Sequence, residues 1–362
     1  MLPDARSTLA ALHPSVFPYG RFALALLIGT LGGWLFARLH MPLPWMLGSM
    51  LACTLGALVT APIAAPKVVR PPMTAVIGVM LGAGFSPELL GHLASWIPTL
   101  VGLVVFMAAC GVACVVYFRR FGGLDPVTAY YAGMPGGLTE MVIMGEQQGG
   151  DARTIALLHS ARVMLLVFTL PFLVQIITGA TFGPRDRLGV SMFDAPWTSE
   201  AWLVGTAVAG SLLGLALRLR AAYLLGPMVV SAGVHLAGLT NFVPPFEIVN
   251  LAQLVIGTSI GCSFAGTAPR AILRVLALSL GSTLILLAIT FAFAGAVSRV
   301  SAYGLVPLLL AYSPGGLAEM SLVALALQIE VAFVAGHHVI RVFLVLSGAN
   351  LAFALMNRSD TP

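Results

Sequence analysis

Two short phrases in this hydrophobic sequence combine helix-breaking residues with a carboxylate. The first is MPGGLTEM at residues 134–141, and the second is SPGGLAEM at residues 313–320. Proline interrupts a helix because it lacks a backbone N–H, and paired glycines permit close backbone approach. A helix that restarts after such a break presents N–H groups without partners and the positive end of its dipole. The pattern therefore predicts two broken helices, each able to attract an anionic group.

Charged and imidazole side chains follow each phrase at the same spacing. His159 precedes Arg162 by three residues, and His338 precedes Arg341 in the same way. This spacing places both side chains on one helix face. A charged residue in a membrane helix costs about 2.5–3.5 kcal/mol on insertion scales, so it should face the interior and be paired. We predict a substrate- or ion-binding site made of Pro135, Gly136, Gly137, Glu140, His159, Arg162, Pro314, Gly315, Gly316, Glu319, His338 and Arg341.

The same residues have structural interpretations. Each glutamate could pair with an arginine to lock the broken helix to its neighbour, and each histidine could simply bond across helices. The glycine-rich segments GVMLGAG and GTSIGCS could be close-packing surfaces, or they could unwind and line the site.

The elements that must position these residues are membrane helices. Of the 362 residues, 59% are hydrophobic and only 9% are charged, whereas soluble domains carry about a quarter charged residues. Apolar runs at 44–64, 97–118, 154–178 and 272–297 approach or exceed the roughly 20 residues that span a bilayer. Weaker runs lie at 22–36, 73–85, 201–217, 223–239, 248–264 and 331–354. We predict an all-α, polytopic helical membrane protein.

The cysteines and methionines indicate no metal centre. Cys53, Cys110, Cys114 and Cys262 all lie in apolar runs, without a CxxC or Cys/His spacing. Methionines near the first phrase are ordinary core filler. We therefore predict no cofactor and no metal site.

The chain contains two related halves. An offset of 179 residues aligns GVMLGAGF with GTSIGCSF, MPGGLTEM with SPGGLAEM, and HSARV with HVIRV. WMLGSM and YLLGPM match at an offset of 178. We predict a membrane repeat at 20–182, a linker at 183–200 and a second membrane repeat at 201–355, each with a helix broken at PGG.

The basic residues favour an inverted second copy. Lys67 and Arg70 follow the second helix of the first copy, whereas Arg270 and Arg274 follow the third helix of the second copy. The basic loops are out of phase by one crossing, as the positive-inside rule expects of upside-down repeats. Paired broken helices in inverted repeats are typical of a transporter's midplane site.

With both PGG phrases and their His/Arg partners, the sequence resembles the Gram-negative membrane AbrB duplication family. Its members carry labels such as AbrB family transcriptional regulator or ammonia monooxygenase. The carriers are MPGGLTEM with HSAR and SPGGLAEM with HHVIR, and the resemblance runs from about residue 22 to 354. It implies an integral bacterial membrane protein, associated by name with gene regulation.

These observations favour a secondary transporter, an exporter or exchanger of a small anionic or carboxylate-bearing solute. The alternative is a membrane-embedded regulator that changes gene expression indirectly, because no soluble helix-turn-helix or basic recognition surface is evident. A monooxygenase would need clustered metal ligands, so we do not expect an enzyme. The expected partners are the lipid bilayer and a small-molecule or ion substrate, with no nucleic acid; a homodimer stays open. The expected location is the bacterial inner membrane, crossed several times.

Overall fold

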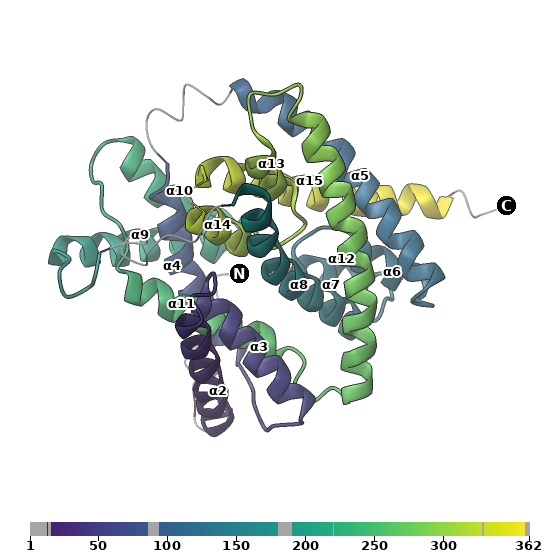
Figure 1. Ribbon diagram of the computed structural model, residues 1–362, viewed down its shortest axis with the longest axis horizontal. Helices are drawn as coiled ribbons and strands as arrows, with labels where there is room; N and C mark the ends of the chain where they lie inside the picture. The colour runs from purple at the N-terminus through teal and green to yellow at the C-terminus, as the bar shows by residue number, and fades with distance from the viewer. Residues whose placement is uncertain are drawn as a thin grey trace. The chain divides into compact units, whose positions relative to one another are not determined.

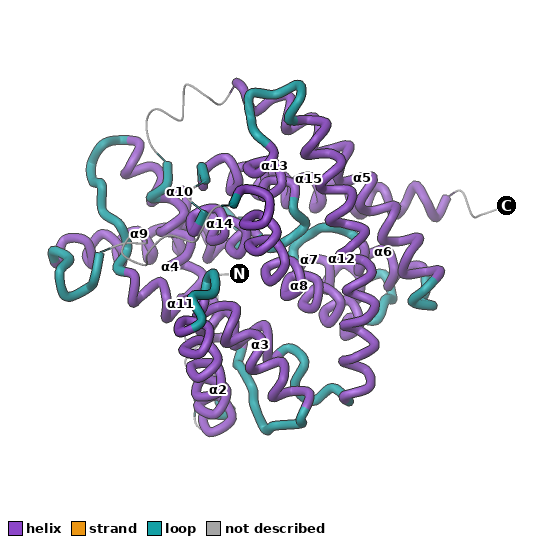
Figure 2. Tube along the Cα trace, in the orientation of Figure 1, coloured by secondary structure: helices purple, strands orange, loops and turns teal. Residues whose placement is uncertain are grey.

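The computed structural model describes residues 13, 16–85, 94–179, 190–219, 221–327 and 329–358, and this part of the chain contains helices and loops without a strand (Figure 2). Figure 1 labels the helices along the chain. They are α2 (Tyr19–Arg38), α3 (Pro44–Leu58), the 3-10 helix η1 (Lys67–Val69), α4 (Arg70–Gly82), α5 (Ile97–Arg120), α6 (Pro126–Gly133), α7 (Leu138–Gln147), α8 (Ala152–Thr178), α9 (Trp197–Ala216), α10 (Ala222–Leu236), α11 (Phe246–Cys262), α12 (Pro269–Val297), α13 (Leu305–Tyr312), α14 (Leu317–Ala326) and α15 (Val331–Arg358). The predicted all-α fold class is confirmed.

Five helices are long and apolar enough to cross a membrane. These candidate spans are Tyr19–Arg38, Ala94–Arg120, Ala152–Ile177, Trp197–Ala216 and Pro269–Val297. On α5, the exposed side chains of Ile97, Val101, Val105, Val112 and Val116 follow one another at helical spacing. Such an apolar stripe is unfavourable in water and suits lipid.

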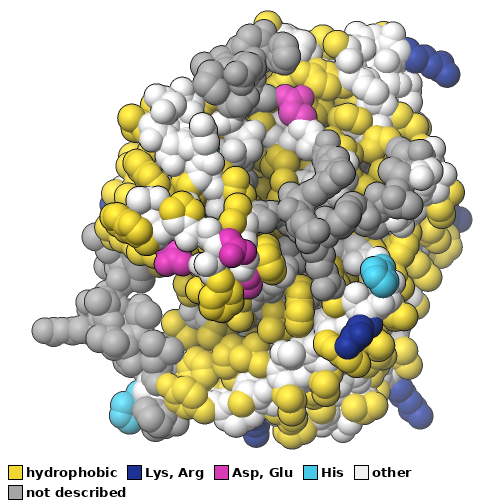
Figure 3. Space-filling view, turned by 60° about the vertical axis from the view of Figure 1, so that its left-hand side comes forward, with side chains coloured by type: hydrophobic (Ala, Val, Ile, Leu, Met, Phe, Trp, Pro, Cys, Tyr) yellow, Lys and Arg dark blue, Asp and Glu magenta, His cyan; other side chains and the backbone are white. Residues whose placement is uncertain are grey.

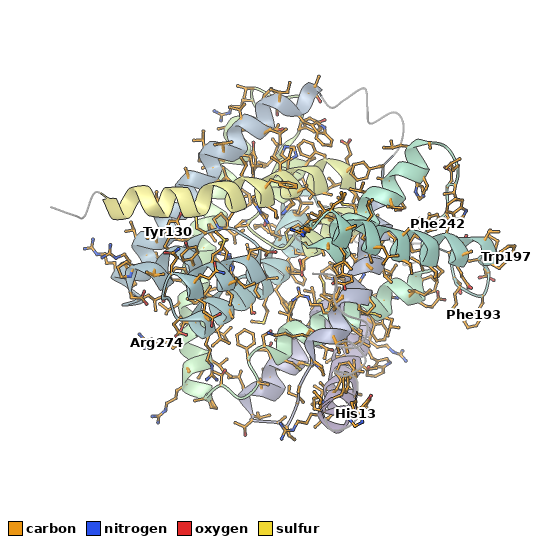
Figure 4. The ribbon with its side chains drawn as sticks, turned by 180° about the vertical axis from the view of Figure 1, so that it is seen from behind. His13, Tyr130, Phe193, Trp197, Phe242 and Arg274 are labelled. Carbon is orange, nitrogen blue, oxygen red and sulfur yellow. The ribbon has the colours of Figure 1, made fainter. Side chains whose placement is uncertain are left out.

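The surface carries the same signature. Figure 3 shows a face on which hydrophobic side chains predominate and charged ones are few. At the start of α9, Phe193 and Trp197 point away from the helices, with exposed fractions of 87% and 77% (Figure 4). Tryptophan, like tyrosine, is enriched at membrane–water interfaces. Together these features establish a membrane protein.

The described helices form two compact units that cut across the predicted halves of the chain. The first unit comprises Met1–Gly91, Ala180–Pro269 and Leu325–Ala332, and the second comprises His92–Gly179, Arg270–Ala324 and Phe333–Pro362. The first unit therefore holds α2, α3 and α4 together with α9, α10 and α11, whereas the second holds α5 to α8, α12, α13 and most of α14 and α15. Each unit draws helices from both predicted repeats.

Close glycine contacts organise the first unit. On α2 and α3, Gly32 and Gly48 face each other so closely that a Cβ on either would collide with the other's backbone. Gly210 of α9 and Gly226 of α10 make the same approach. The second pair lies 178 residues after the first, so the two helix pairs share one packing geometry. Small residues allow this approach in membrane helices.

The third helix of each half packs on the second helix of the other half. A Cβ on Gly78 or Gly82 of α4 would collide with the α10 backbone at Leu224 or Met228. Likewise, Gly257 and Gly261 of α11 lie against the α3 backbone at Met46 and Met50. Gly78 and Gly82 of GVMLGAGF, and Gly257 and Gly261 of GTSIGCSF, are thus helical close-packing positions inside α4 and α11, whereas Gly84 lies just after the end of α4.

The second unit positions both PGG segments. Phe106 of α5 stacks on Tyr312 of α13 and meets Phe293 of α12 edge-on, with ring centroids 5.3 and 5.7 Å away. Arg274 of α12 donates from Nη2 to the Gly122 carbonyl at 3.1 Å, just before α6 begins. Figure 4 labels Arg274 on α12 and Tyr130 on α6. The long helices α5 and α12 therefore hold the short helices that precede the breaks.

The predicted linker is partly helical. Residues 183–189 lie outside the described residues, but α9 begins at Trp197, four residues before the apolar run expected at 201. Pro196 occupies the N-cap position, and proline suits a helix start because the N–H groups there lack intrahelical partners. Thr198, Ser199 and Glu200 make the first turn of α9 polar, so hydropathy alone does not include it in the apolar run.

Candidate functional site

The first break separates two short helices in the second unit. Helix α6 ends at Gly133, Met134 is extended, and α7 begins at Leu138 after the N-cap Gly137. The first helical bond of α7 runs from the Met141 N–H to the Gly137 carbonyl, at 3.0 Å. The N–H groups of the first turn of α7 therefore have no partner within the helix.

His159 and Arg162, on α8, bind the end of α6. The Nε2 atom of His159 lies 2.9 Å from the Tyr131 carbonyl oxygen, so Nε2 carries the proton and donates. Arg162 donates from Nη2 to Nδ1 of His159 at 2.7 Å. The guanidinium also donates to the carbonyls of Ala132 (3.2 Å), Gly133 (3.5 Å) and Met134 (3.2 Å). Both side chains are buried.

We call such a His/Arg pair, bonded to the end of the preceding short helix, a clamp. The clamp of His159 and Arg162 satisfies carbonyls that the break leaves without partners. The last four carbonyls of any α-helix lack intrahelical donors, and the dipole is negative there. A guanidinium offers five donors in a planar fork and a permanent positive charge, so it suits this helix end. Arg162 therefore supplies, inside the protein, the hydrogen bonds that water would supply to these carbonyls at an exposed helix end.

The second break has the same clamp. Between α13 and α14, His338 lies with Nε2 3.0 Å from the Leu310 carbonyl oxygen. Arg341 donates from Nη1 to the Ser313 carbonyl and from Nη2 to the Gly315 carbonyl. In both clamps, the histidine contacts the carbonyl that lies 28 residues before it, and the arginine contacts the carbonyl that lies 28 residues before it.

The two glutamates fold back over the glycines that precede them. A Cβ added to Gly137 would meet the carboxylate of Glu140, and one added to Gly316 would meet that of Glu319. In both cases the glutamate is the third residue of the new helix, where a carboxylate reaches back toward the N-cap. The second glycine of each PGG is therefore required for space. Glu319 is buried, whereas Glu140 is partly exposed.

The two clamps lie near each other within the second unit. The guanidinium groups of Arg162 and Arg341 are close enough to interact electrostatically. Cys110 of α5 lies within electrostatic range of both. At the first break, a Cβ on Gly136 would collide with Val345 of α15, one turn beyond Arg341. The structure therefore brings the twelve predicted site residues into one compact unit and two similar groups, each at a helix interruption.

Asp151 fixes the start of the helix that carries His159 and Arg162. Its carboxylate accepts from the backbone N–H groups of Arg153 (3.0 Å) and Thr154 (3.3 Å), and from the Thr154 hydroxyl (2.5 Å). The Thr154 hydroxyl bond and the backbone bonds hold the pKa of Asp151 below its ordinary value. Asp151 is therefore an ionised N-cap that fixes the rotation of α8.

The breaks differ in their unpaired polar atoms. Around the second break, four buried atoms have no hydrogen-bond partner among the described residues: Ser313 Oγ, Ser321 Oγ, His338 Nδ1 and Arg341 Nε. Around the first, Met134 and Val142 replace the two serines, Nδ1 of His159 is bonded to Arg162, and Arg162 Nε alone is unpaired.

Sequence reasoning missed both serines. It ranked positions by agreement between the two halves, and Ser313 and Ser321 are positions of disagreement. A polar residue in one half opposite an apolar residue in the other was the available signal. His337, which has no counterpart in the first half, is bonded at both ring nitrogens, to Thr99 Oγ1 and the Phe333 carbonyl, at 2.8 Å each. Packed against Trp96, Phe333 and Tyr312, it is a core residue.

Within the described ranges, no group of three or more His, Cys, Asp or Glu side chains is arranged to hold a metal ion. The polar groups that cluster at the breaks are instead guanidinium, imidazole, hydroxyl and carboxylate groups with backbone carbonyls. Such groups bind polar solutes through hydrogen bonds and charge.

Apolar spans, together with buried, clamped helix interruptions, define a helical integral membrane protein with polar groups gathered inside it. The chain belongs to the AbrB family: the family model described as "Transition state regulatory protein AbrB" matches residues 45–357. The resemblance seen in the sequence is thereby confirmed.

Two relatives align over nearly their whole length. One, of Bacillus subtilis (strain 168), is named "Uncharacterized protein YhjN"; it is 26% identical over 348 residues, covering 88% of this chain and 89% of the relative. The other, of Escherichia coli (strain K12), is named "Putative regulator AbrB"; it is 24% identical over 331 residues, covering 91% of this chain and 94% of the relative. These names give no substrate or mechanism.

Proposed function

We propose that this protein is a secondary transporter of the bacterial inner membrane that exports or exchanges a small anionic or carboxylate-bearing solute. One observation carries the proposal: two buried arginines lie within electrostatic reach of each other, each at a helix break. Like charges repel in a low-dielectric interior, and the bonds to carbonyl dipoles add no negative charge. The buried carboxylate of Glu319 lies within electrostatic range of Arg341 and offsets only part of the charge of the two guanidinium groups. An anionic group near both guanidiniums would compensate the charge that the clamps leave.

The helix ends contribute in the same direction. Helices α7 and α14 begin directly after the breaks, and the positive ends of their dipoles lie there. Helix N-termini attract anions through unpaired N–H groups and this dipole. Glu140 and Glu319 are each the third residue of the helix that begins after the break.

The recurring contacts support a duplication whose halves are related by a pseudo-two-fold axis, and the out-of-phase basic loops favour the inverted form. The glycine contacts of α2 with α3 recur in α9 with α10, and each half's third helix packs on the other half's second helix. A reciprocal exchange of this kind is what a pseudo-two-fold relation between the halves produces. Inverted repeats with paired helix breaks are the architecture of many secondary transporters.

The experiment is a thermal-stability screen of the purified protein in detergent with carboxylates, inorganic anions and amines. A solute that binds only the folded protein raises the melting temperature by mass action. We expect a carboxylate to stabilise the wild type, and Arg162→Lys and Glu140→Gln to lose this response while folded. Arg120→Ala, at the exposed end of α5, is the control and should keep it.

Flux completes the test. The stabilising solute should cross liposomes containing the wild-type protein faster than liposomes containing Arg162→Lys. If no solute raises the melting temperature and none is transported, the proposal fails.

The second candidate is a membrane-embedded regulator that alters gene expression indirectly, without binding DNA. The family description and the name of the Escherichia coli relative favour it. We do not propose an enzyme, and a homodimer stays a prediction. Deleting the gene and measuring transcripts separates the candidates: a regulator of this kind changes transcripts even when the exported solute is absent from the medium and the cell.

A further inference from the structure

The second break contains polar groups whose bonding the protein leaves incomplete. Ser313 and His338 are fully buried, and Arg341 is 3% exposed. Their Oγ, Nδ1 and Nε atoms have no partner among the described residues, although Arg341 donates to the Ser313 carbonyl and lies one helical turn from His338. A buried polar group without a hydrogen bond costs about 1–3 kcal/mol, so natural proteins keep few of them.

The chemistry of the three atoms is complementary. The Nε2 atom of His338 lies 3.0 Å from the Leu310 carbonyl, so it carries the ring proton and donates. A neutral imidazole that donates from Nε2 has its lone pair on Nδ1, which accepts. Arg341 Nε–H can only donate, and the Ser313 hydroxyl can donate or accept. The unpaired set therefore offers two donors and one acceptor.

At the first break, the corresponding histidine nitrogen has a hydrogen-bond partner within the protein. There the lone pair of His159 Nδ1 accepts from Arg162 Nη2 at 2.7 Å, and the position of Ser313 is taken by Met134. Arg341 instead directs both terminal nitrogens to carbonyls of the break, which leaves Nδ1 of His338 open. The two breaks share a clamp, but only at the second do a hydroxyl and an imidazole lone pair stay without partners among the described residues.

We propose that the second break binds the head group of a hydroxy- or amino-carboxylate, with its carboxylate on Arg341 Nε and Ser313 Oγ and its O–H or N–H donating to His338 Nδ1. This assignment rests on the proposed function and narrows its substrate class. A simple carboxylate would satisfy the two donors and leave the imidazole lone pair unpaired. A site built to bond a hydroxyl discriminates against the analogue that lacks it.

The test uses three pairs of acids that differ by one hydroxyl: glycolate and acetate, lactate and propionate, malate and succinate. Apparent Kd values come from the melting temperature of the purified protein as a function of acid concentration. We expect at least one hydroxy acid to bind the wild type about tenfold more tightly than its partner, the effect of one buried hydrogen bond. Equal affinities within all three pairs would overturn the assignment but leave the proposed function standing, provided that carboxylates still bind.

A first pair of variants isolates the imidazole acceptor. His338→Gln keeps an amide donor for the Leu310 carbonyl but removes the Nδ1 lone pair, so the tenfold preference should fall to about onefold. His235→Gln is the control, because His235 is a buried histidine of α10 outside the site, bonded to the Ser231 and Phe242 carbonyls, and it should keep the preference. Retention of the preference in His338→Gln would contradict the assignment.

A second pair isolates the hydroxyl. Because the Ser313 hydroxyl is buried and unpaired, Ser313→Ala should raise the melting temperature without ligand and weaken binding of both acids of a pair. Ser282→Ala, which removes a buried hydroxyl bonded to the Ser279 carbonyl at 3.0 Å, should lower the melting temperature and leave binding unchanged. If Ser313→Ala lowers the melting temperature as Ser282→Ala does, the hydroxyl is structural and the assignment is wrong. If no carboxylate of any kind binds or is transported, the proposed function itself fails.

Discussion

The two breaks share the same His/Arg clamp but differ in the side chains and hydrogen bonds that surround it. At the first, Arg162 contacts three carbonyls and a histidine, and an apolar Met134 leads into the PGG. At the second, Arg341 contacts two carbonyls, and Ser313 and Glu319 are buried beside it. The first break is closed by its own hydrogen bonds, whereas the second retains polar capacity. The same local sequence therefore leaves different hydrogen-bonding capacity at its two copies.

Removing the arginines should produce the largest effects and should rank the two breaks. Arg162→Ala leaves three carbonyls and Nδ1 of His159 without a donor inside the protein. Each buried polar group left unsatisfied in this way costs about 1–3 kcal/mol. Arg341→Ala should cost less, because fewer groups lose their donor. The repulsion between the two guanidinium groups is relieved equally in both variants and does not affect the ranking. Melting temperatures in detergent give the ranking, with exposed Arg120→Ala as control. Equal losses would erase the proposed difference between the breaks.

Adding a methyl group to the second glycine of each PGG should sharpen the comparison. Gly316→Ala forces the carboxylate of Glu319 to move within a buried site and should cost about 1–3 kcal/mol, the range for overpacking. Gly137→Ala should cost less, because the carboxylate of Glu140 is partly exposed and can swing aside.

A double-mutant cycle checks the cause of that difference. Glu319→Ala combined with Gly316→Ala should recover most of the loss, since the colliding carboxylate is gone; the same cycle with Glu140 should show weaker coupling. Purely additive losses at the second break would place the strain in the backbone instead.

The smallest effect concerns the start of the helix that carries the first clamp. Asp151→Ala removes an N-cap and should cost about 1 kcal/mol. The folded pKa of Asp151 is lowered, so its contribution is present above the unfolded value of about 3.9 and is lost as pH falls through the folded value. Melting temperatures between pH 3 and pH 7 should therefore converge for wild type and Asp151→Ala at the acid end. A constant difference down to the lowest pH would show that ionisation is irrelevant.

Much of the fold could be predicted from the sequence because membrane helices depend on composition. Every predicted apolar run contains a helix, and each PGG lies between two short helices. The i,i+3 spacing also placed His159 beside Arg162, and His338 beside Arg341. These features are local, and local periodicity determines them.

The remaining features depend on contacts distant in sequence. That Arg162 would bind the carbonyls of α6, about 30 residues upstream, follows from how α8 packs on α6, which no spacing encodes. The grouping of α4 with α10 depends on glycine faces that match only in three dimensions. The hydroxyls of Ser313 and Ser321 were visible as sequence differences, but their lack of partners is a property of the packed unit.

The packing of α4 on α10 also has a consequence for biogenesis. The glycine face of α4 is complete at Gly82, but the backbone that covers it begins at Leu224, which is 142 residues later in the chain (224 minus 82). At a synthesis rate of roughly 5–20 residues per second, that interval is about 7–28 s. During this time the nascent first half must hold an unmatched surface in the membrane, so its correct assembly depends on the ribosome finishing the second half.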